Sequence, residues 1–195
     1  MDAARSVMAD KGADATTLRD IADAAGLGLG TLYNHFDGKD GVVEAIVDDA
    51  VESLRHTLDE LTASLADPAE IFSVAFRQTL RMVEADPIWG WFVVRVPAAR
   101  ERVAAHLGER STRNISRGLR SGRFQLPGRR SFYIACEGLL LAGMQAKLDD
   151  RTRRGDDERF AELGLRMLGL EHDEARRTSQ IPLPALGSRG TPDTP

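Results

Sequence analysis

The chain has 195 residues and a formal net charge of −4, with 42% hydrophobic and 29% charged residues, which is ordinary for a globular protein of one or two domains. Its longest apolar runs are far too short to span a bilayer, which argues against a membrane-spanning protein. The single cysteine cannot form an internal disulfide and no export signal opens the chain, so we expect a cytoplasmic protein.

Apolar residues recur at intervals of three and four along the chain, and this spacing predicts an all-α fold. The first helix is expected over residues 1–11, with Gly12 as its C-terminal stop. Thr17 is the expected N-cap of the second helix, and Asp20 completes a variant of the capping box with it. Gly26 is expected to end that helix in the left-handed conformation.

The next expected helices are a short one over residues 29–35 and a long one from residue 37 or 38 to residue 65. Pro68, Pro87 and Pro97 mark places where one helix closes and the next begins. The last three long helices are expected over residues 98–121, 130–148 and 156–170.

Residues 17–36 are the most informative segment, because they predict two short helices joined by a tight glycine turn. This is the layout of a helix-turn-helix, in which one helix braces the other and the second enters the major groove of DNA. The segment therefore predicts a DNA-binding regulator.

The same part of the chain contains small, apolar and aromatic residues at a specific spacing. They are Ala3-Ala4, Gly12, Thr16-Thr17, Ile21-Ala22, Ala25-Gly26, Gly30-Thr31-Leu32-Tyr33, His35-Phe36 and Lys39. In this pattern the chain closely resembles the N-terminal domain of TetR/AcrR-family transcriptional regulators. The remainder of the chain resembles that family only in its helical pattern and its length.

The resemblance implies a homodimer whose two N-terminal domains enter successive major grooves of a palindromic, double-stranded operator. It also implies a C-terminal domain that binds a small-molecule effector and then loses affinity for DNA. In the family, the last two long helices of each subunit form the dimer. Here these are residues 130–148 and 156–170.

The resemblance also implies which residues contact DNA. These are Thr16, Thr17, Gly28, Leu29, Gly30, Thr31, Tyr33, Asn34, His35 and Lys39. Thr17, Tyr33 and Lys39 match positions of phosphate contacts, as expected near helix N-termini and at exposed polar groups. Gly28 and Leu29 depart from the serine and lysine that are common in the family, and Leu29 could instead touch a thymine methyl group.

The expected DNA-binding domain is acidic, with eight acidic and four basic residues among its first 47. Phosphate binding usually coincides with a basic surface, so this balance needs an explanation. Family members often carry a basic arm before the first helix. Our hypothesis is that the natural protein extends upstream of Met1 and is more basic there.

The aromatic segment around residues 88–92 predicts either plain core or a pocket for an apolar or aromatic effector. Arg95 is either an anion anchor in that pocket or a surface arginine. The candidate ligand-binding residues are Met82, Trp89, Trp91, Phe92, Arg95, Phe132 and Cys136.

Residues 97–130 contain nine arginines and only two glutamates. Three interpretations are open: a solvated helix face, a site for an anionic effector such as an acyl-coenzyme A, or additional attraction to the DNA backbone.

Other patterns carry no chemistry of their own. Residues 26–30 superficially resemble a glycine-rich phosphate loop, but no strand precedes them, so we interpret them as a turn. The histidines lack partners at metal-ligand spacing, and no catalytic constellation occurs. We therefore expect no metal, no cofactor and no enzymatic activity.

We expect an all-α protein with a three-helix helix-turn-helix domain over residues 1–46. A larger effector-binding and dimerisation domain is expected over residues 47–175, and a disordered tail over residues 176–195. The predicted function is a TetR-like repressor that a small apolar or amphipathic effector releases from DNA. The alternative is a helical ligand-binding dimer whose DNA binding is weak or lost.

Overall fold

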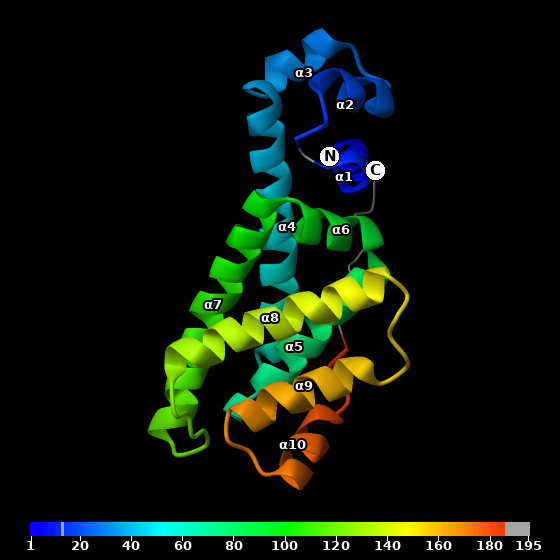
Figure 1. Cartoon of the computed structure of the whole chain (residues 1–195). Coiled ribbons are helices and arrows are strands. Elements are labelled where there is room, and N and C mark those ends of the chain that lie inside the picture. The colour runs from blue at the N-terminus through cyan, green and yellow to red at the C-terminus, as the bar shows by residue number, and fades with distance from the viewer. Residues whose placement is uncertain (13, 186–195) are drawn as a thin grey trace, which may run out of the picture.

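The computed structural model describes residues 1–12 and 14–185. Ten helices and no strand occur in these residues, which confirms the predicted all-α class (Figure 1). The helices are α1 Asp2–Lys11, α2 Leu18–Ala25, α3 Leu29–His35, α4 Gly38–Thr62, α5 Pro68–Ala85, α6 Pro87–Arg95, α7 Pro97–Arg120, α8 Arg129–Leu148, α9 Asp156–Met167 and α10 His172–Ser179. None of these helices is long and apolar enough to cross a membrane.

The helices α1 to α3 form a unit at one end of the molecule, and α4 descends from it into the larger part (Figure 1). Because α4 is one continuous helix of 25 residues, no linker separates the two parts. The expected boundary at residue 46 falls inside this helix. A displacement of α4 in the larger part is therefore transmitted directly to the start of the chain.

Two hydrophobic cores support this arrangement. The smaller core joins α1, α2, α3 and the first half of α4, and it includes Met8, Ile21, Leu32 and Ile46. The larger core surrounds α5 and includes side chains from α4 to α10. The helix α6 contributes to both, because Phe92 packs in the smaller core while Trp89 and Val93 pack in the larger one.

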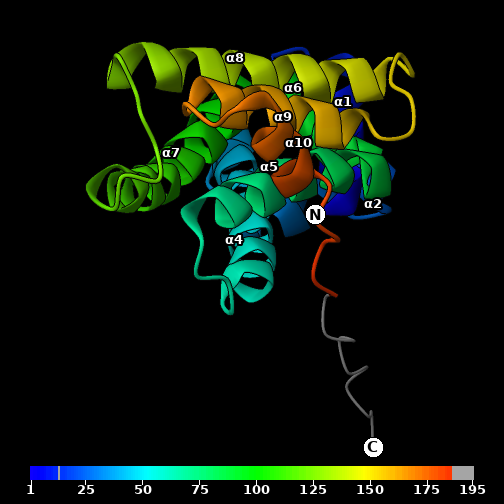
Figure 2. The same ribbon diagram turned by 90° about the horizontal axis from the view of Figure 1, so that it is seen from below.

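The larger part is layered around α5. Figure 2 shows α8 and α9 on one side of the molecule and α4 on the other, with α5 between them. Close approach in this part depends on glycine, since a Cβ at Gly164 of α9 would lie 2.6 Å from the ring of Phe72 on α5. The two helices can pack this tightly only while that position has no side chain.

The prediction of a disordered tail from residue 176 is wrong for residues 176–179, which form the last turns of α10, with Thr178 and Ser179 buried. The physical cause lies on α5, where Arg77 is only 2% exposed and needs acceptors for its donors. Its Nη1 donates to the carbonyl of Ile181 at 2.5 Å, and it forms ion pairs with Asp157 and Glu158 of α9. Residues 186–195 of the expected tail lie outside the described residues.

Candidate DNA-binding surface and ligand cavity

The capping box predicted at the start of α2 is confirmed. The Thr17 hydroxyl accepts from the Asp20 amide at 3.1 Å, and the Thr17 amide donates to the Asp20 carboxylate at 2.8 Å. Lys11 also donates to this carboxylate at 2.8 Å, and together with Thr17 it holds the pKa of Asp20 well below its usual range. These contacts fix the angle at which α2 leaves the preceding loop.

The neighbouring Thr16 does not belong to the exposed surface where the sequence placed it. Its side chain is buried, and its hydroxyl donates to the carbonyl of Gly12 at 2.7 Å. Thr16 thus closes the loop after α1 from the inside, whereas Thr17 remains exposed at the N-terminus of α2.

The short helix α3 has the predicted bounds and presents one polar surface to solvent. Its exposed residues, together with the N-cap, are Gly28, Gly30, Thr31, Tyr33, Asn34 and His35. Leu32 is buried beneath them, and Tyr33 is 60% exposed. Leu29 is half-buried and packs against the smaller core, so this residue supports α3 from below in addition to any contact with DNA.

Lys39 lies in the first turn of α4, directly after α3. Its Nζ donates to the carbonyl of Asp14 at 3.2 Å, which ties α4 to the loop between α1 and α2. A cation is thereby held at the start of α4, a few residues after α3.

The acidic residues of this domain lie outside α3, and Asp37 and Asp40 follow it within a few residues. Residues 27–36 contain no acidic side chain. Two of the acidic residues are neutralised by partners, since Asp2 pairs with Arg5 and Asp20 pairs with Lys11. The negative balance of the domain therefore arises from residues outside α3 itself.

The larger core contains two adjoining cavities. The first, which we call the α5 cavity, has a volume of about 70 Å³ and lies between α5, α7 and α8. The second, which we call the α6 cavity, has a volume of about 280 Å³ and lies between α6, α7 and α8. Leu107, Ser111, Cys136 and Leu140 line both. Together the cavities reach only the lower end of the roughly 300–1,000 Å³ typical of ligand pockets, so a ligand here must be small.

The walls of the α5 cavity are mainly apolar, with a few polar groups. Phe72, Phe76 and Leu107 provide apolar surface, and Arg110 and Asn114 provide polar atoms. The Asn114 amide donates to the carbonyl of Pro68 at 2.8 Å, so its donor group is already engaged. Together with the α6 cavity, a site of this kind can hold a ring and orient one or two oxygen atoms.

Cys136 is the one residue of the predicted ligand set that lines either of these cavities. Burial raises the pKa of its thiol to about 12. The side chain is therefore neutral at physiological pH and acts as apolar wall, not as a nucleophile.

The other predicted ligand residues have different positions. Trp91, Phe92 and Arg95 lie at the contact between α6 and α1, where the Arg95 guanidinium stacks 4.0 Å from the Trp91 ring centroid and donates to the carbonyl of Ala9 at 2.7 Å. Phe92 packs in the smaller core, and Arg95 with Trp91 connects α6 to α1. These residues therefore hold the two parts of the molecule together and line neither of the two cavities. Phe132 packs on Phe72 in the larger core.

Met82 and Trp89, by contrast, line a surface groove beside α4 and α5 and not the cavities. Many of the residues that line the cavities belong to α7, and they were not predicted from the sequence. Their signal was present, since Val103, Leu107 and Ser111 recur at helical spacing on one face of a helix that otherwise reads as charged.

The arginine run of α7 forms structural contacts with α4 and α5. Arg102 pairs with Asp48, and Arg110 with Asp59, both on α4. Arg117 donates to the carbonyl of Ala66 at 3.0 Å. Arg113 and Arg120 are exposed, which agrees with the interpretation of a solvated face for part of the run.

The helices α8 and α9 expose large apolar side chains on the side of the molecule away from α4. Ile134 of α8 is 63% exposed and Leu163 of α9 is 47% exposed. The exposed residues around Ile134 include the small residues Ala135, Gly138 and Ala142 and the charged residues Arg130 and Glu137. Such a face permits close approach of another helix.

Two family models match the chain. The model described as bacterial regulatory proteins of the tetR family matches residues 1–46. The model described as a tetracyclin repressor-like C-terminal domain matches residues 67–180. The first match ends inside α4, and the second begins after the end of α4, at the start of α5.

Curated relatives match part of the chain. The HTH-type transcriptional repressor KstR2 of Rhodococcus jostii is 43% identical over 67 residues, which is 34% of this chain and 33% of the relative. KstR2 of Mycolicibacterium smegmatis is 35% identical over 81 residues, which is 42% of this chain and 40% of the relative. The chain thus spans well under half the length of these two relatives.

Solved structures match over nearly the whole chain. RolR without ligand has a TM-score of 0.74 and 34% sequence identity, and the match covers 95% of this chain and 97% of RolR. RolR in complex with resorcinol has a TM-score of 0.73 and 35% identity, with 94% and 92% covered. The fatty acid degradation regulator FadR from Bacillus halodurans has a TM-score of 0.71 at 18% identity, covers 84% of this chain and 91% of its own, and shares the fold.

Proposed function

Because this chain belongs to the TetR family of bacterial regulatory proteins, we propose that it is a transcriptional repressor that a small aromatic molecule releases from its operator. The observation that carries this proposal is the continuity of α4. This single helix begins directly after the exposed polar surface of α3 and ends against α7, which also lines the α5 and α6 cavities.

The proposed DNA interface consists of two kinds of contact. Gly30, Thr31, Asn34 and His35 on α3 reach base edges in the major groove, where side-chain donors and acceptors can distinguish base pairs. Tyr33 and Lys39, with the exposed N-terminus of α2, bind phosphates and set the orientation of the helix.

We infer that the repressor is a homodimer on a palindromic, double-stranded operator and works in the cytoplasm. The exposed apolar face of α8 and α9 supports this, because Ile134 and Leu163 are otherwise left in water. Two copies packed through this face place two α3 helices on the same side. The half-sites then lie about 34 Å apart, one turn of DNA.

The effector class follows from the cavities and from the resemblance to RolR. RolR has been solved with resorcinol, and the present chain shares about a third of its residues over nearly its whole length. The α5 cavity alone is too small for a benzene ring, but together with the adjoining α6 cavity it offers ring-sized, mainly apolar space next to Phe72 and Phe76. We therefore propose a small phenolic or otherwise oxygen-substituted aromatic molecule as the effector.

Release requires that the effector bind one dimer geometry more tightly than another. A repressor whose two α3 helices must stay about 34 Å apart loses affinity when their separation changes by a few ångströms. The effector, acting on the helices around α5, shifts the dimer toward the geometry that does not fit the operator.

The alternative function is a ligand-binding helical dimer with weak DNA binding. It is favoured by the acidic balance of the first 47 residues and by Leu29 at a position where the family often has lysine. The lack of acidic side chains in residues 27–36 argues against it.

A gel-shift assay with the DNA upstream of the chain's own gene tests the proposal. We expect specific binding that weakens as the salt concentration rises, because phosphate contacts release counterions. Resorcinol should dissociate the complex, and a scrambled DNA of equal composition serves as the control. Binding no tighter than to scrambled DNA at low salt would refute the repressor and favour the alternative.

A further inference from the structure

We propose that Arg110 is the residue that senses the effector: its Nε–H donates to an oxygen of an aromatic molecule that occupies the adjoining α5 and α6 cavities, and this bond alters the hold of Arg110 on the end of α4. The inference rests on the proposed function and deepens it. It assigns the polar contact of the ligand and the route by which binding reaches DNA.

The first step is the position of Arg110. It lies on α7 and lines the α5 cavity, together with Phe72, Phe76 and Leu107. Its Nε is buried and has no hydrogen-bond partner within residues 1–12 and 14–185. A buried, unpaired N–H of a permanently charged group gains strongly from a hydrogen bond. We therefore expect it to donate to a ligand oxygen atom placed in this cavity.

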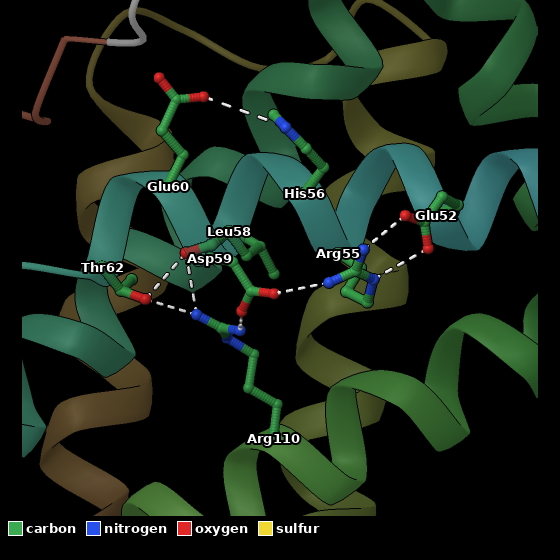
Figure 3. Close-up of polar contacts among 8 residues, drawn as sticks. All are labelled: Glu52, Arg55, His56, Leu58, Asp59, Glu60, Thr62 and Arg110. Atoms are coloured by element: carbon green, nitrogen blue, oxygen red, sulfur yellow. Dashed lines mark hydrogen bonds and ion pairs between the residues drawn. The ribbon is translucent and has the colours of Figure 1, made fainter.

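The second step is what the rest of the guanidinium does. Figure 3 shows Nη1 bound to the Asp59 carboxylate and Nη2 bound to the Leu58 carbonyl and the Thr62 hydroxyl. These three acceptors, one main-chain carbonyl and two side chains, belong to the last turns of α4. Arg110 is therefore the clamp that fixes the C-terminal end of α4 against α7.

The third step is the length of α4. A helix of 25 residues is roughly 37 Å long. Tilting such a rod by about 3° displaces its far end by about 2 Å. The far end follows α3 directly, and Ile46 and Val47 fix it in the smaller core. A change at Arg110 thus moves the proposed recognition helix by the distance that a paired operator cannot tolerate.

The class of ligand follows from the apolar residues and the single guanidinium that line the α5 cavity. The phenylalanines and leucines accept a single aromatic ring, whereas Arg110 requires an acceptor oxygen at the ring's edge. Phenolic and carboxylate oxygens both meet this requirement, and a methyl group does not. Resorcinol, benzoate and toluene are ring-sized probes that separate these cases.

The chain supplies a matched control on the same helix. Arg102 of α7 also pairs with a carboxylate of α4, Asp48, but it lines neither cavity. Arg102→Gln removes an ion pair between α7 and α4, and Arg110→Gln removes an ion pair together with the proposed ligand contact.

Calorimetric titration of each probe into the purified full-length protein tests the assignment. We expect wild type and Arg102→Gln to bind resorcinol or benzoate at least tenfold more tightly than Arg110→Gln does. Toluene should bind all three proteins alike. Whether resorcinol or benzoate binds wild type more tightly distinguishes a phenolic from a carboxylate effector.

A second variant separates sensing from transmission and does not depend on the folding of Arg110→Gln. Thr62→Val keeps the shape of the side chain and removes one acceptor of the clamp outside the α5 cavity. We expect it to bind the preferred probe within twofold of wild type, and to need several-fold more of it for release from operator DNA.

Several results would overturn the inference. Equal binding of resorcinol by wild type and Arg110→Gln would do so, as would equal losses in Arg110→Gln and Arg102→Gln, or wild type binding toluene as tightly as the oxygenated probes. Wild type that binds none of the probes would remove both this inference and the proposed effector class. Operator binding in the gel shift would still stand in that case.

Discussion

The two hydrophobic cores of this chain place their functional side chains in opposite directions. In the smaller core, Leu32 and Ile46 fill the interior, and the residues proposed to contact DNA project outward from α3 into solvent. In the larger core, the interior is incompletely filled, and Arg110 and Cys136 line the resulting space while also packing against neighbouring helices. Substitutions at the first surface can therefore change function without changing stability, whereas substitutions around the cavities change both.

The two regions are joined by two helices. α4 carries Ile46 in the smaller core and Leu54 in the larger one, and α6 carries Phe92 in the smaller core and Val93 in the larger one. Arg95 strengthens this joint through its bond to the carbonyl of Ala9. The two regions thus differ in where their functional side chains lie, but they cannot move independently.

The largest expected effect comes from filling a tight glycine position in the larger core. A Cβ at Gly118 would lie 2.1 Å from the ring of Phe124, which is itself buried. We expect Gly118→Ala to lower the free energy of unfolding by about 3 kcal/mol, as overpacking of a filled core does. Thermal unfolding followed by circular dichroism should show a midpoint lower by roughly 6–12 °C.

The control for this prediction lies in the other region. Nothing lies within 4 Å of a Cβ placed at Gly30 of α3. Gly30→Ala should therefore unfold at or slightly above the wild-type temperature, since alanine favours helix by up to about 1 kcal/mol. Similar midpoints for the two variants would contradict the division between a filled interior and an open surface.

The next effect concerns the phosphate contacts. Tyr33→Ala and Lys39→Ala should each weaken operator binding by roughly tenfold, which is about 1.4 kcal/mol. Only Lys39→Ala should also reduce the slope of log K against log salt, by about one, because Lys39 is a cation whereas the Tyr33 hydroxyl is neutral and releases no counterion. Tyr33 is 60% exposed, so its replacement should leave the unfolding temperature unchanged. Gel shifts at several salt concentrations, with operator and scrambled DNA, measure both quantities.

Both variants should lose affinity for all sequences alike. A variant that changed sequence preference while keeping the overall affinity would show that the residue reads bases, and the assignment to phosphates would be wrong. In that case the residue would belong to the base-reading part of the exposed surface around α3, and fewer residues of that surface would serve to position the helix on phosphates.

A third effect tests the local support of the DNA-binding surface. Thr17→Ala removes the acceptor of the capping box at α2, which should cost about 1 kcal/mol of stability. Thr17→Ser keeps the oxygen and serves as the control. Chemical denaturation measures the difference, and an alanine variant as stable as the serine variant would mean that the cap does not hold α2 in place.

The two regions also differ in how far they could be predicted. The bounds of α3 and the cap at Thr17 followed from signals within a few residues, including Gly26 with its positive φ of 65°. The cavity walls depend on which face of α7 turns toward α5 and α8, and no local signal determines that crossing. Arg110 was accordingly visible only as part of a charged run, since its acceptors on α4 lie about 50 residues earlier in the chain.

The same reasoning explains α10. Its sequence is polar, so local composition predicted disorder from residue 176. What orders the segment is Arg77, more than 90 residues away, which binds the carbonyl of Ile181. A contact of this range cannot be inferred from either segment alone.

The smallest expected effect concerns the acid dependence of stability near the cavity. The Arg110 guanidinium beside Asp59 holds the pKa of that carboxyl below its usual range. The folded pKa is thus lower than the unfolded one, so the contribution of Asp59 to stability is present above about pH 4 and is lost as the pH falls through the folded pKa. Because Asp59 is largely exposed, this contribution should stay below about 1 kcal/mol.

Asp59→Asn should therefore be slightly less stable than wild type at pH 7, and the difference should shrink as the pH falls below about 4, because the unfolded wild type then takes up a proton at this carboxyl. Unfolding by urea at a series of pH values measures this. A difference that stayed constant down to pH 3 would mean that shape, and not charge, links Asp59 to Arg110. The clamp on α4 would then depend on the Leu58 carbonyl and the Thr62 hydroxyl, and it should be insensitive to acid.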